Sequence, residues 1–240
     1  MFALQLQNVY LKIRKHQILK DISFSIPPKK ICVFIGENGA GKSSTIRCIL
    51  GLQKITYGTG SIFGKSIFNY QSRQNVSFVP DIEQFIDISV RQWILEQNKY
   101  FNLPVLTIYK RLNVLMKDAG LSKEILSRNI VSLSSGLKKI IMVVSALISQ
   151  RKLVIMDEPT EYLDPIMKKN FFNLMQKHKC KGITFFVSTH NLLEIDKYVD
   201  YLVVIKNGEI ALSKYWNKHK INLQKAYEKF YESNDTSNFD

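Results

Sequence analysis

The chain lacks a long hydrophobic run. Its longest apolar stretch, residues 140–148, is interrupted by Ser145 and falls short of the roughly 18 residues that a membrane-spanning helix needs. The first residues, MFALQLQN, show no basic segment followed by an apolar block, so we expect no signal peptide. Any role at a membrane must therefore come through a partner.

Cysteine is scarce as well. Cys32, Cys48 and Cys180 are odd in number and widely spaced, and no Cys-x-x-Cys pair is present. This pattern argues against a disulfide framework and against a zinc site. We expect three buried thiols in a reducing cytoplasm.

Acidic residues are outnumbered. The 240 residues carry 34 basic and 20 acidic side chains, for a formal net charge of +14. Such an excess fits nucleic-acid binding, an anionic membrane surface, or a lysine-rich solvated surface, and the spread of basic residues along the chain gives the last about half the weight. The 45% apolar content excludes a disordered chain.

The hydrophobic pattern indicates alternating strands and helices. Alternation at residues 2–6 and 22–26 predicts half-buried strands, and continuous apolar runs predict buried ones. The buried strands are predicted at 31–35, 76–79, 153–156, 183–187 and 202–205. Helices are predicted at about 42–50, 165–178 and 191–198. Such an order favours an α/β fold with a mostly parallel sheet.

Two regions depart from this alternation. Helical spacing dominates from about residue 89 to 149, which indicates an inserted all-helical block. Asn207-Gly208 predicts a hairpin turn. The tail after Leu212 is rich in lysine and aromatic residues, with a helix expected at 221–231 and a frayed end.

Residues 36–43, GENGAGKS, match the phosphate-loop pattern G-x-x-x-x-G-K-[ST] in full. A buried strand precedes the motif and a helix follows it, as the chemistry requires. Glycines let successive backbone N–H groups surround phosphate oxygens, and the helix N-terminus favours negative charge. Lys42 would contact the β and γ phosphates, and the Ser43 hydroxyl would bind Mg²⁺. The alternative, a glycine turn with a surface lysine, fits this context poorly.

An acidic pair ends another predicted strand. Asp157 and Glu158 follow the apolar run at 153–156. Asp157 is placed to hold Mg²⁺ through water, and Glu158 can act as a general base on the attacking water. Alone, such a pair is often only a helix-capping carboxylate. Together with the phosphate loop it predicts nucleotide hydrolysis.

These motifs resemble the nucleotide-binding subunit of ATP-binding-cassette transporters, over about residues 4–212. Leu133-Ser134-Ser135-Gly136 stands where that family has its signature, usually Leu-Ser-Gly-Gly. Thr189-His190 matches the switch histidine. Pro159-Thr160 and Leu163-Asp164 continue the acidic motif and end the loop that crosses the cassette interface.

The resemblance implies a P-loop NTPase core with a mostly parallel sheet, an N-terminal antiparallel β subdomain and an inserted all-helical subdomain. It places the core at 1–84 plus 150–212, the helical subdomain at 85–149 and a tail at 213–240. It also implies a second cassette, identical or paralogous, which binds ATP through the signature. By physics alone, the start of a helix at Leu137 with Ser134 before it fits an anion site or an ordinary N-cap, and both can hold because the cap also presents donors outward.

Several positions depart from the family pattern. Asp81 stands where glutamine is usual, and its carboxylate can approach Mg²⁺ but cannot donate a hydrogen bond while ionised. Glu161 and Tyr162 replace small residues. The aromatic residue that stacks on adenine is expected near Ile13, and Tyr10 is the nearest candidate, although a plain strand tyrosine is equally plausible.

The expected site therefore has three parts. The residues expected in catalysis are Glu158, His190 and Lys42. Those expected to hold ATP are Gly36, Asn38, Gly39, Ala40, Gly41, Lys42, Ser43, Ser44, Ser134, Ser135 and Gly136. Those expected at Mg²⁺ are Ser43, Asp157 and Asp81.

The resemblance favours an ATPase that drives export of a drug, peptide or similar substrate through a separate membrane permease, at the cytoplasmic face of the cell membrane. Exposed apolar residues in or near the helical block, among them Phe85, Ile86, Trp93, Tyr100 and Phe101, would form the docking groove, or else pack in the core. The alternative is a soluble ATPase of the same type acting on nucleic acid or the ribosome. We expect no nucleic-acid partner, because such relatives carry two cassettes or a long insertion. A non-hydrolysing ATP sensor is disfavoured by Glu158.

Overall fold

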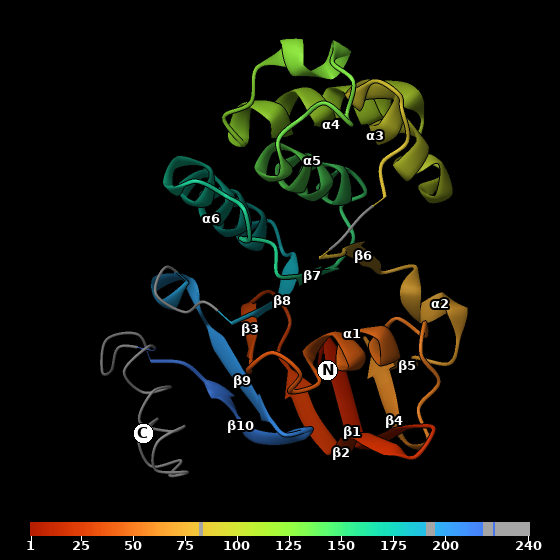
Figure 1. The fold of residues 1–240 in the computed structure, drawn as a ribbon. Coiled ribbons are helices and arrows are strands. Elements are labelled where there is room, and N and C mark those ends of the chain that lie inside the picture. Colours follow the sequence, from red (N-terminus) through yellow and green to blue (C-terminus); the bar gives the residue numbers. More distant parts are fainter. Residues whose placement is uncertain (82–83, 191–194, 218–222, 224–240) are drawn as a thin grey trace.

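The computed structural model describes residues 1–81, 84–190, 195–217 and 223 (Figure 1). Its strands are β1 (Leu4–Ile13), β2 (His16–Ile26), β3 (Ile31–Ile35), β4 (Tyr57–Ile62), β5 (Lys65–Ser66), β6 (Val76–Val79), β7 (Leu153–Asp157), β8 (Thr184–Thr189), β9 (Tyr201–Lys206) and β10 (Glu209–Tyr215). Its helices are α1 (Lys42–Ile49), α2 (Tyr70–Arg73), α3 (Val90–Asn98), α4 (Val105–Asp118), α5 (Ser135–Ile148) and α6 (Pro165–Cys180), with 3-10 turns at Lys99–Phe101, Lys123–Ser127 and Asp196–Tyr198.

The strands form two sheets. One is four-stranded and antiparallel, in the order β2-β1-β4-β5. The other runs β10-β9-β3-β8-β7-β6, in which the pairs from β9 to β6 are parallel and β10 is antiparallel to β9. The mostly parallel sheet and the antiparallel part expected from the sequence are therefore both present.

Most expected elements lie within a few residues of their predicted bounds, but the first strand begins at Leu4 rather than at residue 2. The segment β4, β5 and α2 has no counterpart in the prediction. Its strand Tyr57–Ile62 contains two glycines, which weaken strand propensity, so pairing with β1 rather than local sequence forms it. Residues 191–194 and, apart from residue 223, the tail helix at 221–231 lie outside the described residues, while Asp196–Tyr198 is a 3-10 turn.

The expectation of three buried cysteines is wrong at one position. Cys32 and Cys48 are buried, whereas Cys180, the last residue of α6, is exposed. Burial raises the pKa of the Cys48 thiol to about 11, so it stays a thiol at neutral pH. All three cysteines are free, as expected from their spacing.

Helix α1 packs between the two sheets. Its apolar residues Ile46 and Ile49 are fully buried and share one core with residues of both sheets. The same core holds Phe24 of β2, Phe34 of β3 and Phe186 of β8, whose ring centroids lie 5.3–5.9 Å apart. These rings join the antiparallel sheet to the parallel one, in the core that also holds α1.

The helices α3, α4 and α5 gather in one block beyond β6 and β7 (Figure 1). Helix α5 is its centre, because eleven of its residues are buried, most of them aliphatic. A second core runs from this block through α6 to the other face of the parallel sheet. Among the described helices, none is both long and apolar enough to cross a bilayer.

The hairpin predicted at Asn207-Gly208 joins β9 to β10. Both residues have positive φ, at 51° and 81°, as the tight turn requires. The Gly208 N–H donates to the Ala40 carbonyl at 3.1 Å, and its carbonyl accepts from the Lys20 N–H at 2.7 Å. The turn therefore links the phosphate-loop segment to β2.

Phe186→Ala tests the aromatic junction between the sheets. We expect it to lower the free energy of unfolding by about 3–5 kcal/mol, because it leaves a cavity that neighbouring rings cannot fill. Phe68→Ala, at a ring 60% exposed, is the matched control and should cost less than about 0.5 kcal/mol. Equal effects of the two substitutions in urea unfolding would contradict the packing.

His178 of α6 should make stability depend on pH. Burial, aided by Lys181, lowers the pKa of this imidazole from 6.5 to about 4. As pH falls from about 6.5 to 4 the unfolded chain takes up a proton that the folded chain refuses, so stability falls by about 2–3 kcal/mol and then levels off. Urea titrations at pH 7 and pH 4 should show this component missing from His178→Leu and retained in His16→Gln, at an exposed histidine.

Candidate functional site

Three parallel strands end at one place. Ile35 of β3 pairs with Thr189 of β8, and Ser188 of β8 pairs with Asp157 of β7. Because the carboxyl ends of parallel strands share one edge, the loops that follow these strands meet there, where open α/β sheets bind ligands. This edge carries the phosphate loop, the acidic pair and His190.

The phosphate loop requires its glycines. A Cβ on Gly36 would lie 2.6 Å from the Ile205 carbonyl, and one on Gly41 would lie 2.8 Å from Leu19. Gly39 and Gly41 also have positive φ, at 84° and 110°, which glycine adopts without strain. The loop is thus pressed against β9 and the start of β2, while residues 37–39 remain exposed and accessible to a ligand.

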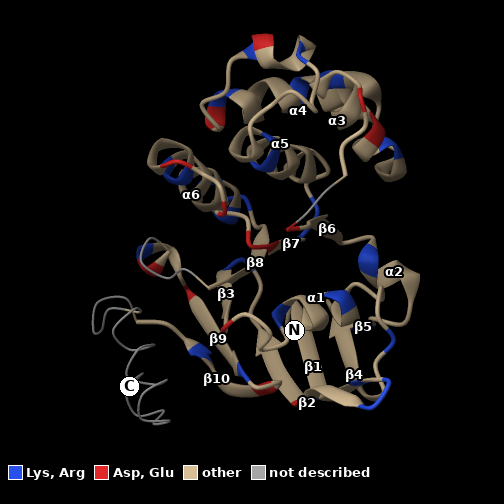
Figure 2. Ribbon diagram, in the orientation of Figure 1, with Lys and Arg blue, Asp and Glu red and all other residues tan. Residues whose placement is uncertain are grey.

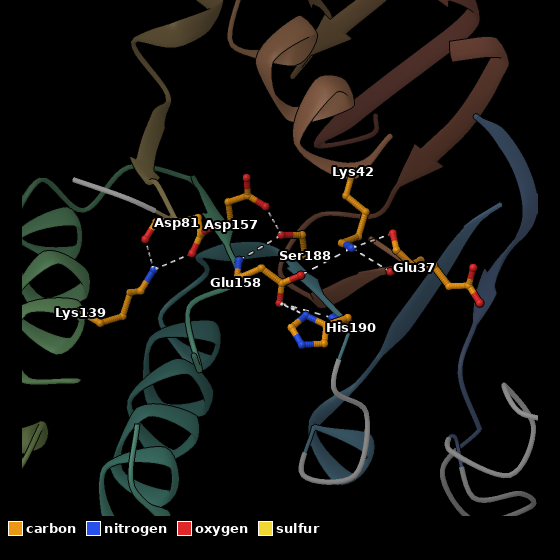
Figure 3. Close-up of polar contacts among 9 residues, drawn as sticks. Glu37, Lys42, Asp81, Lys139, Asp157, Glu158, Ser188 and His190 are labelled. Carbon is orange, nitrogen blue, oxygen red and sulfur yellow. Dashed lines mark hydrogen bonds and ion pairs between the residues drawn. The ribbon is translucent and has the colours of Figure 1, made fainter. Parts of the chain in front are cut away.

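Lys42 directs its charge back over this loop. Its side chain is only 7% exposed, and Nζ donates to the carbonyls of Gly36 at 2.7 Å and Glu37 at 3.2 Å (Figure 3). The same ammonium lies 3.5 Å from Oε1 of Glu158. A buried cation whose partners are two carbonyls and one carboxylate is suited to an anionic ligand that enters the loop.

Glu158 bridges the loop and the switch position. Its Oε2 lies 3.1 Å from Nδ1 of His190 and accepts from the His190 N–H at 3.3 Å. Its own N–H donates to Oγ of Ser188 at 3.1 Å. With φ at +45°, Glu158 occupies a left-handed conformation that non-glycine residues rarely adopt. The carboxylate therefore sits between Lys42 and His190, as Figure 3 shows.

Ser188 is a site residue that the sequence reasoning missed. Its hydroxyl donates to Oδ1 of Asp157, which is 7% exposed, and accepts from Glu158. It thereby orients both acidic residues at once. Its position in the sequence could have indicated this role, because Ser188, like Asp157, is a polar residue at the end of a buried apolar strand.

The signature residues lie at the start of α5. Ser134 is its N-cap and accepts from the Leu137 N–H at 3.3 Å, so the N-cap interpretation describes the structure. Ser134 and Ser135 are exposed, while Gly136 is buried. A Cβ on Gly136 would lie 2.6 Å from the Tyr162 carbonyl, so this glycine allows α5 to approach the loop after β7.

Asp81 contacts a lysine of α5. Its carboxylate lies 3.5 Å from Nζ of Lys139, on α5. Tyr10, the candidate for stacking on adenine, lies on β1 with its ring edge-on to Tyr57 at 6.1 Å, which is the arrangement of a strand tyrosine. The remaining loop residues, Asn38, Ala40, Ser43 and Ser44, lie in or next to the phosphate loop, where Ser43 and Ser44 are half-buried.

The donor set fits a magnesium nucleotide. Ser43 and Asp157 offer the hard oxygen atoms that Mg²⁺ prefers, and the glycine cradle with Lys42 offers positive charge and N–H groups to phosphate. Within the described residues no group of three His, Cys, Asp or Glu side chains forms a metal cage of its own.

Comparison with known proteins identifies the family. The family model for ABC transporters matches residues 19–161, and the chain belongs to this family of ATP-hydrolysing enzymes. A putative ABC transporter ATP-binding protein of Mycoplasma pneumoniae is 32% identical over 83% of this chain and 62% of its own length. The manganese transport system ATP-binding protein MntB of Bacillus subtilis is 32% identical over 95% of this chain and 93% of its own.

Solved structures agree on the fold. One titled as the ATP-binding subunit of an ABC transporter superposes with a TM-score of 0.82, at 25% identity, over 95% of this chain and 93% of its own. The cbiO1 protein of Clostridium perfringens superposes with a TM-score of 0.80 at 24% identity, over 97% and 96% of the two chains. The expected fold class is therefore confirmed.

Lys42→Ala tests where the phosphates bind. Mg-ATP at about 100 times its dissociation constant should stabilise the wild type by roughly 2.7 kcal/mol and raise its melting temperature. Lys42→Ala should abolish that rise, while Lys54→Ala, at an exposed lysine outside the loop, should keep it. A full shift in Lys42→Ala by differential scanning fluorimetry would refute this placement.

Proposed function

We propose that this chain hydrolyses Mg-ATP to power export of a drug, peptide or similar substrate through a separate membrane permease. The observation that carries the proposal is the position of Glu158 between Lys42 and His190, at 3.5 and 3.1 Å. A carboxylate held between the phosphate-loop lysine and the switch histidine is placed to act on a water molecule beside the terminal phosphate. This arrangement favours hydrolysis over mere ATP sensing.

In the proposed step, water attacks the γ-phosphorus in line with the bond to ADP. The new P–O bond forms as the bond to the β-phosphate oxygen breaks, and the proton of the water passes to Glu158. Lys42 stabilises charge on the phosphate oxygens, and His190 orients the carboxylate. Mg²⁺, held by Ser43 and Asp157 when bound, supplies further charge neutralisation. Asp81 is a third candidate for that ion once its carboxylate leaves Lys139.

We further propose that two cassettes close around ATP. The exposed Ser134 and Ser135 at the N-terminus of α5 offer donors and a favourable dipole to an anion bound by a partner cassette. Each ATP would then join two subunits, and hydrolysis would release them. ABC cassettes act in this way as partners of permeases, which supports both expected partners, a second cassette and a transmembrane subunit.

The proposal of peptide export rests on relatives. The lantibiotic transport ATP-binding protein SrtF of Streptococcus pyogenes is 28% identical over 93% of this chain, and the bacitracin transport ATP-binding protein BcrA of Bacillus licheniformis is 31% identical over 79% of it. A groove between β6 and the helical block, lined by Trp93, Gln97 and Phe101 among others, is the proposed permease contact. Within this block Ile86 and Tyr100 are exposed, whereas Trp93 is 4% exposed and packs in the core.

Net charge gives no comparable support to a nucleic-acid role. Among the described residues, Lys and Arg occur on the helical block, on α6 and around the antiparallel sheet rather than in one stripe (Figure 2). A nucleic-acid surface needs basic residues clustered on one face. We propose that the chain acts at the cytoplasmic face of the membrane through its permease, with residues 85–149 as the permease-contacting part and 1–84 plus 150–212 as the ATP-binding part.

Glu158→Gln tests the hydrolytic assignment. The amide keeps the shape but cannot accept the proton, so phosphate release should fall by about 10²–10⁴-fold while the Mg-ATP shift in melting temperature persists. The variant should also accumulate in an ATP-bound dimer, measured by size-exclusion chromatography with light scattering. Glu161→Gln, at a neighbouring acidic residue, is the matched control and should release phosphate at nearly the wild-type rate.

Export is tested with the permease captured from detergent-solubilised membranes by the tagged chain. In vesicles holding that complex with this chain outside, ATP added outside should drive labelled bacitracin into the lumen, and Glu158→Gln should not. Uptake of no peptide by an ATP-hydrolysing complex would overturn the cargo proposal. Wild-type protein that never releases phosphate, even with its permease, would overturn the enzyme proposal.

A further inference from the structure

Lys139 is a buried cation outside the phosphate site. It lies one turn into α5, and its side chain is 4% exposed. Its Nζ donates to the main-chain carbonyls of Asp81 at 2.6 Å and Pro80 at 3.3 Å, and lies 3.5 Å from the Asp81 carboxylate. A charge is buried at such cost only when its partners satisfy it, so these three contacts define where the loop after β6 can run.

The surroundings of Lys139 are acidic from two directions. Burial lowers the pKa of its ammonium, while Asp81, Glu161 and Asp157 act in the opposite sense. Asp81 follows β6, and the other two belong to the segment that begins at the end of β7. Figure 3 shows the Lys139–Asp81 pair on the far side of Asp157 from Lys42. Lys139, on α5, is thus a cation that faces acidic residues of both the loop after β6 and the loop after β7.

A second contact fixes the same turn of α5. Gly136, one turn before Lys139, packs so closely on the Tyr162 carbonyl that a Cβ would lie 2.6 Å away. The first two turns of α5 are therefore held by the loop after β7 on one side and by the loop after β6 on the other. These turns follow directly from Ser134 and Ser135.

We propose that Lys139 is a positioning residue that fastens the signature end of α5 to the loop carrying Asp81, so that both move as one unit relative to the phosphate loop. This inference rests on the proposed function, because it assigns the signature end a role in closing on ATP. Two of the three contacts use main-chain carbonyls, so the fastening persists when the Asp81 side chain turns away. A partner that binds the helical block would then influence the ATP site through Lys139.

The matched control is Lys138, the preceding residue on the same helix. It is half-exposed, and its ammonium lies 5.5 Å from the ring centroid of Phe85. Lys138→Met and Lys139→Met remove the same charge from adjacent positions. Lys139→Arg restores donors to the carbonyls, and Asp81→Ala removes only the carboxylate contact.

The experiment is amide hydrogen exchange of the full chain without nucleotide, followed by steady-state ATPase kinetics. Lys139→Met should speed exchange at residues 79–81 and 133–138 by about tenfold, through loss of charge-assisted hydrogen bonds. Lys138→Met should change it less than twofold. Lys139→Arg should recover most of the protection, and Asp81→Ala should lose less than half as much as Lys139→Met. In the kinetics, Lys139→Met should lower kcat by about tenfold with KM for ATP within twofold.

Outcomes against the proposal are distinct from failure of the proposed function. Unchanged exchange in Lys139→Met, equal effects of Lys138→Met, or a rise in KM without a fall in kcat would overturn the positioning role. If Lys139→Met does not fold, Lys139→Arg and Asp81→Ala decide: near-normal exchange at residues 133–138 in Lys139→Arg together with a partial loss of protection in Asp81→Ala upholds the proposal, and either full loss or no change in Asp81→Ala overturns it. Absence of ATP hydrolysis in the wild type would instead overturn the proposed function, while the exchange result would still stand.

Discussion

The approach of one ammonium to one carboxylate organises this molecule. Lys42 and Glu158 are 116 positions apart in sequence, yet Nζ and Oε1 are 3.5 Å apart and both side chains are largely buried. Such a pair is stable only if the groups around it are fixed, because each charge removed from water must be compensated. The parallel pairing of β3, β8 and β7 provides that fixation.

The two sheets support the phosphate loop and α1 in different ways. The parallel sheet brings three loop segments to one edge, and Phe24 of the antiparallel sheet packs against Phe34 and Phe186 of the parallel sheet in the core that also holds α1. The phosphate loop is thus the start of a helix enclosed on two faces. A loop so enclosed keeps its N–H groups in place before a ligand arrives, which lowers the ordering cost of binding.

Much of this arrangement was readable from sequence, and the failures have physical causes. The loop at 36–43 and the acidic pair were found because glycine spacing and a strand-ending carboxylate are local patterns. Ser188 and Lys139 were missed because their roles depend on partners 31 and 58 residues away. The strand Tyr57–Ile62 was missed because its order comes from pairing with β1. The contact of Asp81 with Lys139 was not foreseen because its partner lies on a distant helix, and the assignment of Asp81 to Mg²⁺ stays a prediction.

The turn at Asn207-Gly208 has a consequence for anyone who modifies this chain. A two-residue hairpin on the outside of a protein is the usual choice for inserting a tag, a fluorophore or a foreign epitope. Here Gly208 has no room for a side chain, since a Cβ would lie 2.4 Å from the Ile18 carbonyl. Its N–H also donates a hydrogen bond to the Ala40 carbonyl. An insertion there would displace the backbone of the phosphate loop at Ala40 and so disturb nucleotide binding, although the turn is not itself part of that loop.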